Sequence, residues 1–91
     1  MPKRLGKAEI QKKLKSLSGW SLKGSAIVRH YQFSGFVPAV AFVNHVAGLA
    51  EGMDHHPDIL IQYKNVTLTL STHTAKGLTD LDFKLAKKID L

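Results

Sequence analysis

The sequence predicts an α+β fold in which helices and paired strands alternate in the order α-β-β-α-β-β-α. Two observations predict it. Apolar residues recur at helical spacing in three segments, and β-rich runs broken by short turn signals lie between those segments. A chain of 91 residues with 44% hydrophobic and 22% charged residues has the size and composition of one globular domain. We therefore expect a single domain over 1–91 without a linker.

The first helix is expected from about Lys7 to Leu17. Ile10, Leu14 and Leu17 follow one another at intervals of four and three residues and form its apolar stripe. The pair Ser18-Gly19 then interrupts the pattern, which predicts the end of the helix there.

The segment 20–33 is expected to form a β-hairpin around the turn 23–25. Its second strand alternates, so that Ile27 and Arg29 lie on one face and Val28 and His30 on the other.

The central helix is expected to begin after Ser34, with that residue as its cap and Pro38 in its first turn, and to run to about Met53. Two neighbouring apolar stripes run along it. The second one indicates either a subunit contact or a broad core face. The first, buried stripe comprises Phe36, Val40, Val43, Ala47 and Ala50, and the second comprises Phe42, His45 and Leu49.

The second hairpin is expected from two β-rich runs, 59–63 and 66–73, around the two-residue loop 64–65. If Tyr63 pairs with Val66, Ile61 and Ile59 face Leu68 and Leu70, and Tyr63 belongs to this apolar core face. Extended backwards, the same register places His56 opposite His73, with their Cβ atoms about 5 Å apart.

The last helix is expected to begin at Thr79, with Asp82 at the acidic position of a capping box and Leu81, Leu85 and Ile89 on its apolar side. Asp82 lies near that apolar side. An inward carboxylate needs a hydrogen-bonding partner, for which His73 is the candidate.

Composition excludes several classes of function. The absence of cysteine removes disulfides, thiolate nucleophiles and sulfur-ligated zinc. The net charge of +6 comes mainly from lysines near both ends, and solvated helix faces account for them, so no direct nucleic-acid partner is expected. No segment approaches the ~20 apolar residues of a membrane span, and no signal-peptide pattern opens the chain. The expected location is cytoplasmic.

The candidate chemistry centres on 51–58, where Pro57 disfavours helical backbone at His56 and the central helix must end. His55, His56 and His73 flank a strand pair, and imidazole titrates near neutrality, as acid–base catalysis requires. Glu51 and Asp82 are the accompanying carboxylates. Two alternatives remain: a merely polar helix end, and a metal site, against which the divergence of adjacent histidines on an extended backbone argues.

The spacing of these residues resembles that of the pterin-4a-carbinolamine dehydratases, also known as dimerization cofactors of a hepatocyte transcription factor. The resemblance covers nearly the whole chain. Its motif residues are Glu51, His55-His56-Pro57, an aromatic at Tyr63, His73 and Asp82, together with the runs 70–73, 77–79 and 82–89.

The resemblance implies a four-stranded antiparallel sheet with three helices packed on one face, assembled as a homodimer or homotetramer. It implies a hydro-lyase that dehydrates 4a-hydroxytetrahydrobiopterin to the quinonoid dihydropterin without metal or cofactor, in the pathway that serves aromatic amino acid hydroxylases. It also offers an alternative function, the binding and dimerization of a transcription factor. The implied catalytic residues are His55, His56 and His73, and the implied substrate contacts are Asp54, His55, His56, Ser71, Thr72, His73 and Thr74.

Two positions depart from many family members. Ile59 stands where many have Trp, which alters a wall of the pocket or the subunit contact. Thr74 stands where many have an acidic residue. We expect His55 to act as base and His56 or His73 as acid, with Glu51 or Asp82 orienting a ring.

Overall fold

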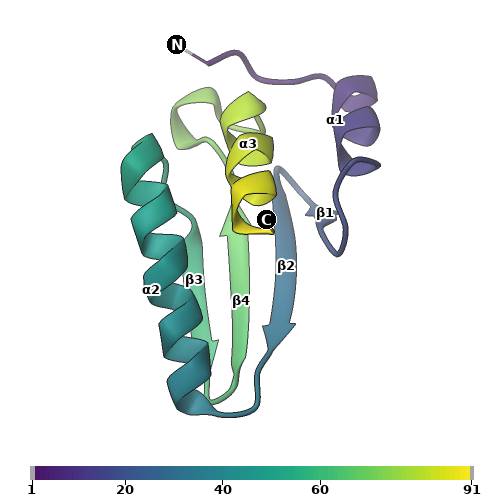
Figure 1. Cartoon of the computed structure of the whole chain (residues 1–91). Coiled ribbons are helices and arrows are strands. Elements are labelled where there is room, and N and C mark those ends of the chain that lie inside the picture. The colour runs from purple at the N-terminus through teal and green to yellow at the C-terminus, as the bar shows by residue number, and fades with distance from the viewer. Residues whose placement is uncertain (1, 91) are drawn as a thin grey trace.

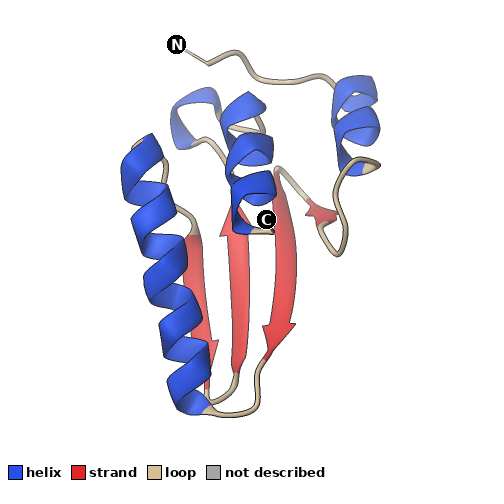
Figure 2. Ribbon diagram, in the orientation of Figure 1, coloured by secondary structure: helices blue, strands red, loops and turns tan. Residues whose placement is uncertain are grey.

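The computed structural model describes residues 2–90 and consists of a four-stranded antiparallel sheet, in the order β1-β2-β4-β3, with the helices on one side of it (Figures 1 and 2). The predicted fold class and element order are confirmed; the 3₁₀ turn η1 was not predicted. In chain order the elements are α1 (Lys7–Leu14), β1 (Ser21–Lys23), β2 (Ala26–Gln32), α2 (Phe36–Met53), β3 (Asp58–Gln62), β4 (Asn65–Leu70), η1 (His73–Ala75) and α3 (Asp80–Ile89).

Two helix ends differ from the prediction. Helix α1 ends at Leu14 because the chain tightens there: the amide of Leu17 bonds the carbonyl of Leu14, and the Ser16 hydroxyl bonds the carbonyl of Lys13. Helix α2 is capped by Gly35, whose carbonyl accepts the Ala39 amide at 3.3 Å. Ser34, predicted as the cap, therefore lies outside the helix.

The buried face of α2 is rotated from the predicted stripe. Ala39, Val46 and Ala50 are the buried residues of this helix, whereas Phe36 is 54% exposed. Small side chains at the contact let the helix lie close to the sheet. Phe42 packs its ring against Tyr31, with the centroids 4.5 Å apart. Phe42 and Leu49 of the second stripe therefore widen the core face within the chain, whereas His45 is exposed.

Helix α2 is also long and apolar enough to cross a membrane, by length and composition only. The expectation that no segment approaches a membrane span is therefore not met by this helix. Core helices meet the same criterion, and Ala39, Val46 and Ala50 pack into the protein core.

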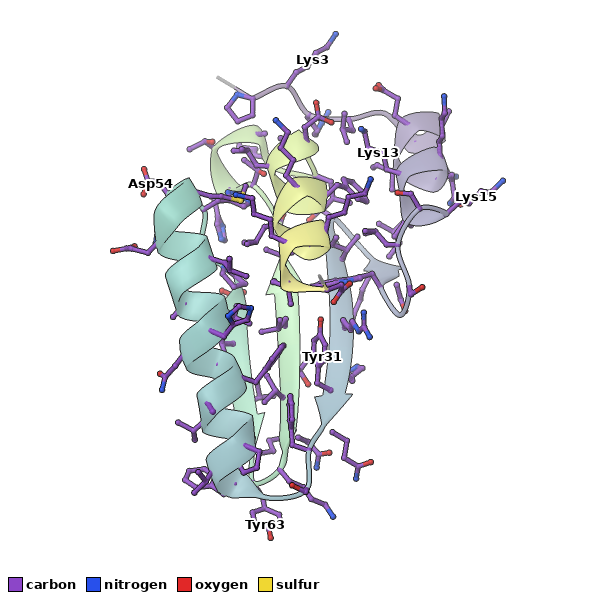
Figure 3. All side chains as sticks on the ribbon, viewed as in Figure 1. Lys3, Lys13, Lys15, Tyr31, Asp54 and Tyr63 are labelled. Carbon is purple, nitrogen blue, oxygen red and sulfur yellow. The ribbon has the colours of Figure 1, made fainter. Side chains whose placement is uncertain are left out.

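The second hairpin has a different register from the predicted one. The loop is Tyr63-Lys64, with Tyr63 at a φ of 56°, and Ile61 pairs with Val66 and Ile59 with Leu68. The difference is two residues, and a slip of two keeps every side chain on its face, so the apolar pattern does not distinguish the two registers. Tyr63 is 66% exposed in this loop, far from the core position expected for it (Figure 3).

The core lies between the sheet and the helices. The sheet contributes Ile27 of β2 with Val66, Leu68 and Leu70 of β4, all fully buried. Helix α3 contributes Leu85 and Ala86, and Trp20, which directly precedes β1, also belongs to this buried cluster. The opposite face of the sheet carries Val28, His30, Thr67 and Thr69 and is not covered by another element within residues 2–90.

The carboxylate of Asp90 fixes the C-terminal end of α3. Both carboxylate oxygens of Asp90 are used: Oδ2 accepts from Trp20 Nε1 at 2.8 Å and pairs with Arg29 at 2.9 Å, and Oδ1 accepts from the Tyr31 hydroxyl at 3.0 Å. Burial, and then the hydrogen bond to Asp90, raise the pKa of Tyr31 above its ordinary value. One aspartate thus joins the end of α3 to β2 and to the segment before β1.

Removal of the Asp90 carboxylate should destabilise the fold measurably. Asp90→Ala leaves the buried Trp20 N–H and the Tyr31 hydroxyl without their acceptor, at a cost of about 1–3 kcal/mol in the free energy of unfolding. Urea denaturation measures the loss. Asp80→Ala is the matched control, because its ion pair with Lys13 is exposed and contributes less than about 1 kcal/mol. Equal losses in both variants would contradict the role of Asp90.

Candidate functional site

Three element ends meet at one end of the molecule and carry most of the predicted site residues. Figure 1 shows the C-terminal end of α2, the end of β4 with η1, and the start of α3 at the same end of the sheet. Asp54 marks this end in Figure 3. His55 follows α2, Thr72 and His73 follow β4, and Asp82 lies in the first turn of α3.

The end of α2 turns His55 inward. Asp54 adopts the left-handed conformation at a φ of 50°, its amide bonds the carbonyl of Glu51, and the His55 amide bonds the carbonyl of Ala50 at 3.1 Å. This pair of bonds is a Schellman motif, and Asp tolerates the left-handed position better than most residues. The helix therefore ends at Met53, before the restriction that Pro57 imposes, and His55 is not part of an extended strand.

His55 and Asp82 form a buried pair. His55 Nε2 lies 2.6 Å from Asp82 Oδ1, and the side chains are 9% and 0% exposed. The sequence predicted that Asp82 points inward and needs a partner, but it named His73. The partner is His55, because the Schellman turn places that ring over the start of α3.

The second oxygen of Asp82 is also saturated. Oδ2 accepts from the Thr72 hydroxyl at 2.8 Å and from the Thr79 amide at 3.0 Å. The predicted capping box of Thr79 and Asp82 is confirmed. The same carboxylate therefore caps α3 and holds His55. Sequence reasoning missed the role of Thr72, although an inward capping-box acid signals that a further donor is needed.

His56 and Glu51 form a second, exposed pair. His56 Nε2 lies 2.6 Å from Glu51 Oε1, and the side chains are 56% and 79% exposed. The predicted cross-strand pairing of His56 with His73 is wrong, because β3 begins at Asp58 and β4 ends at Leu70. Neither histidine lies in a strand.

The remaining predicted residues lie around the histidine–carboxylate pairs at the same end of the molecule. His73 begins η1 and is exposed, as are Thr74 and Asp54. The Ser71 hydroxyl donates to the carbonyl of Ser25 at 2.9 Å, which ties β4 to the turn before β2. The Thr72 amide donates a hydrogen bond to the carbonyl of Gly77 at 2.9 Å, which closes the short loop after β4.

The arrangement offers one oriented imidazole and two accessible ones. Asp82 fixes the buried ring of His55, which suits a base that must present one nitrogen, while the exposed rings of His56 and His73 are free to meet a ligand. Within residues 2–90 no three His, Asp or Glu side chains converge on a point that would hold a metal ion.

Two surface depressions lie elsewhere on the molecule. One of about 690 Å³ surrounds Arg29 and Asp90, and one of about 500 Å³ lies on the uncovered sheet face around His30. Neither is lined by His55, His56 or His73. The assignment of the site rests on its side-chain chemistry rather than on the size of a cavity.

Comparison with known proteins identifies relatives that match almost the whole chain. The family model described as pterin 4 alpha carbinolamine dehydratase matches residues 3–91. A Sulfurisphaera tokodaii protein provisionally named pterin-4-alpha-carbinolamine dehydratase is 49% identical over 97% of this chain and 95% of its own length. A Chloroflexus aurantiacus protein with the same provisional name is 52% identical over 96% of this chain and 94% of its own length.

A solved structure shares the fold. The transcriptional coactivator/pterin dehydratase from Brucella melitensis superposes with a TM-score of 0.91 at 39% identity, covering 96% of this chain and 95% of that one. The architecture of this chain is therefore that of the dehydratase structure.

The two histidine–carboxylate pairs have equal lengths but should differ in their contribution to stability. Asp82→Ala removes the acceptor of three donors in a buried setting and should lower the free energy of unfolding by about 3 kcal/mol. Glu51→Ala breaks an exposed pair and should cost less than about 1 kcal/mol. Thermal and urea denaturation of both variants measure the difference. A loss for Glu51→Ala as large as that for Asp82→Ala would show that burial does not govern these pairs.

Proposed function

The chain belongs to the pterin 4 alpha carbinolamine dehydratase family, and from this premise we propose that it is a hydro-lyase acting on 4a-hydroxytetrahydrobiopterin. The reaction removes water from the 4a-carbinolamine and yields the quinonoid dihydropterin. The observation that carries the proposal is the buried His55–Asp82 pair beside the exposed rings of His56 and His73. Dehydration needs acid–base groups of this kind and no redox step.

The proposed reaction requires two proton transfers. The departing hydroxyl must receive a proton, and the ring nitrogen beside it must lose one, and positioned acid–base groups contribute about 10²–10⁴-fold to such steps. In our proposal His55, held by Asp82, is the base. His56 or His73 is the acid, and Glu51 orients the ring of His56 through their 2.6 Å contact.

The substrate contacts proposed from the family resemblance need one refinement. The hydroxyls of Ser71 and Thr72 and the amide of Thr72 already donate within the protein, so in our proposal Thr72 lines the site without donating to the pterin. Asp54, His55, His56, His73 and Thr74 complete the proposed contact set. The enzyme would work in the cytoplasm, in the recycling of the cofactor of aromatic amino acid hydroxylases.

Self-association is part of the proposal. Strand β3 is an edge strand whose residues are all exposed, Leu60 to 52%, and Val37 at the start of α2 is 77% exposed. Exposed apolar side chains along an unpaired strand edge favour pairing with another chain. We propose a homodimer or homotetramer that covers this surface.

A second candidate function is the binding of a transcription factor. The Brucella melitensis structure described as a transcriptional coactivator/pterin dehydratase favours it, at 39% identity. The apolar surface of β3 and of the start of α2 would serve such a partner. Partner binding that survives His73→Ala and is lost in Val37→Glu would separate this role from catalysis.

The catalytic proposal is tested by the three histidine variants. His55→Ala, His56→Ala and His73→Ala should each lower the rate of dehydration of freshly generated 4a-hydroxytetrahydrobiopterin by about 10²–10⁴-fold, because each removes an acid–base group. His45→Ala is the control, since that residue lies on the exposed side of α2 away from the site. Parent rates in all three folded variants would refute the proposed mechanism.

The molar mass of the protein in solution tests the proposed self-association. Light scattering of the parent should give a multiple of the 10.0 kDa protomer, and Leu60→Lys should lower it, because a lysine at the paired edge places charge in the contact. Lys64→Ala, in the loop after β3, is the control with a changed charge outside the strand. A parent that remains at 10.0 kDa at high concentration would contradict the proposed assembly.

A further inference from the structure

Two buried threonine hydroxyls lie behind the candidate base. Thr72 is 5% exposed and Thr79 is fully buried, and their Oγ1 atoms are 2.8 Å apart. Thr72 Oγ1 is also 2.8 Å from Asp82 Oδ2, and Asp82 Oδ1 is 2.6 Å from His55 Nε2. The four side chains form a continuous chain of hydrogen bonds from the cap of α3 to the imidazole.

The donors and acceptors fix the direction of this chain. A carboxylate only accepts, so the single hydrogen of the Thr72 hydroxyl goes to Asp82. Thr72 must then accept the hydrogen of Thr79, and the Thr79 oxygen accepts the Leu81 amide at 3.3 Å. Every hydrogen therefore points from the start of α3 towards Asp82.

This direction determines which nitrogen of His55 carries hydrogen. Asp82 receives two donors on Oδ2, as an ionised carboxylate does, and a carboxylate can only accept hydrogen bonds. Nε2 of His55 is therefore the donor to Oδ1, which leaves Nδ1 with a lone pair in the neutral ring.

The free nitrogen reaches the surface. His55 Nδ1 has no hydrogen-bond partner within residues 2–90, and in that part of the chain no fully buried side-chain nitrogen or oxygen lacks one. Nδ1 is therefore in contact with the exterior, although the His55 residue is only 8% exposed.

We infer that Thr72 and Thr79 are positioning residues which, through Asp82, hold His55 with hydrogen on Nε2 and present Nδ1 as the atom that takes the substrate proton. The inference deepens the proposed function and rests on it. It also changes the role of Thr72, whose hydroxyl serves the histidine and does not contact the pterin.

Thr72 is the discriminating residue of the pair. Thr79 caps α3, so its removal would also weaken the helix. Thr72 lies outside α3, and Thr72→Val keeps its shape while removing the hydroxyl. Thr69→Val is the matched control, because it makes the same change in β4 on the uncovered face of the sheet.

The experiment is NMR of protein labelled with ¹⁵N in the histidine rings, at a pH where His55 is neutral. The parent should show hydrogen on Nε2 of His55, with a slowly exchanging low-field proton, and a bare Nδ1. Thr72→Val should lose the slow exchange and gain the Nδ1–H form, and Thr72→Ser should restore the parent spectrum. Hydrogen on Nδ1 of His55 in the parent protein would overturn the inference. This measurement needs no variant, so the inference can be tested even if Thr72→Val does not fold.

Dehydration kinetics provide the second readout. Thr72→Val should lower kcat by roughly ten- to a hundredfold with little change in KM, the range expected for loss of a hydrogen bond to a charged group. Thr72→Ser should recover most of the rate, and Thr69→Val should match the parent. A fall in kcat with unchanged His55 signals, or parent kcat in Thr72→Val, would overturn the inference. If the parent does not dehydrate the pterin at all, the proposed function fails, while the nitrogen signals still decide how His55 is held.

Discussion

The carboxylate of Asp82 is the constraint on which the geometry of the candidate site depends. It is fully buried and accepts from His55, Thr72 and the amide of Thr79. A buried charge is tolerated only where such donors surround it. These donors come from the end of α2, the end of β4 and the start of α3, so a single group fixes three elements relative to one another. The position of His55 follows from that constraint.

Helix α3 is fixed by an aspartate at each end. Asp82 binds it to the histidine site, and Asp90 binds it to Trp20, Arg29 and Tyr31 beside β2. Between the two, Leu85 and Ala86 pack into the core. The helix therefore has little freedom to shift on the sheet, and a rigid support of this kind favours a catalytic group that must keep its direction.

Local rules predicted more of the fold than of the site. Helical spacing and turn residues gave the element order, and the capping box of Thr79 and Asp82 was predicted correctly because it depends on residues only three positions apart. The hairpin register was missed because a two-residue slip keeps the apolar face unchanged. The partner of Asp82 was missed because the left-handed turn at Asp54 sets it, and the sequence gives no strong signal of that turn.

Three histidines at one end of the sheet are the centre of the proposed function, and ligand binding tests them most directly. NMR of the histidine rings during titration with 7,8-dihydrobiopterin, a stable analogue of the substrate, reports contact without relying on catalysis. The ring signals of His55, His56 and His73 should shift together at saturation while those of His30 and His45 stay in place. Shifts confined to His30 or His45, or no shift at all, would contradict the proposed function.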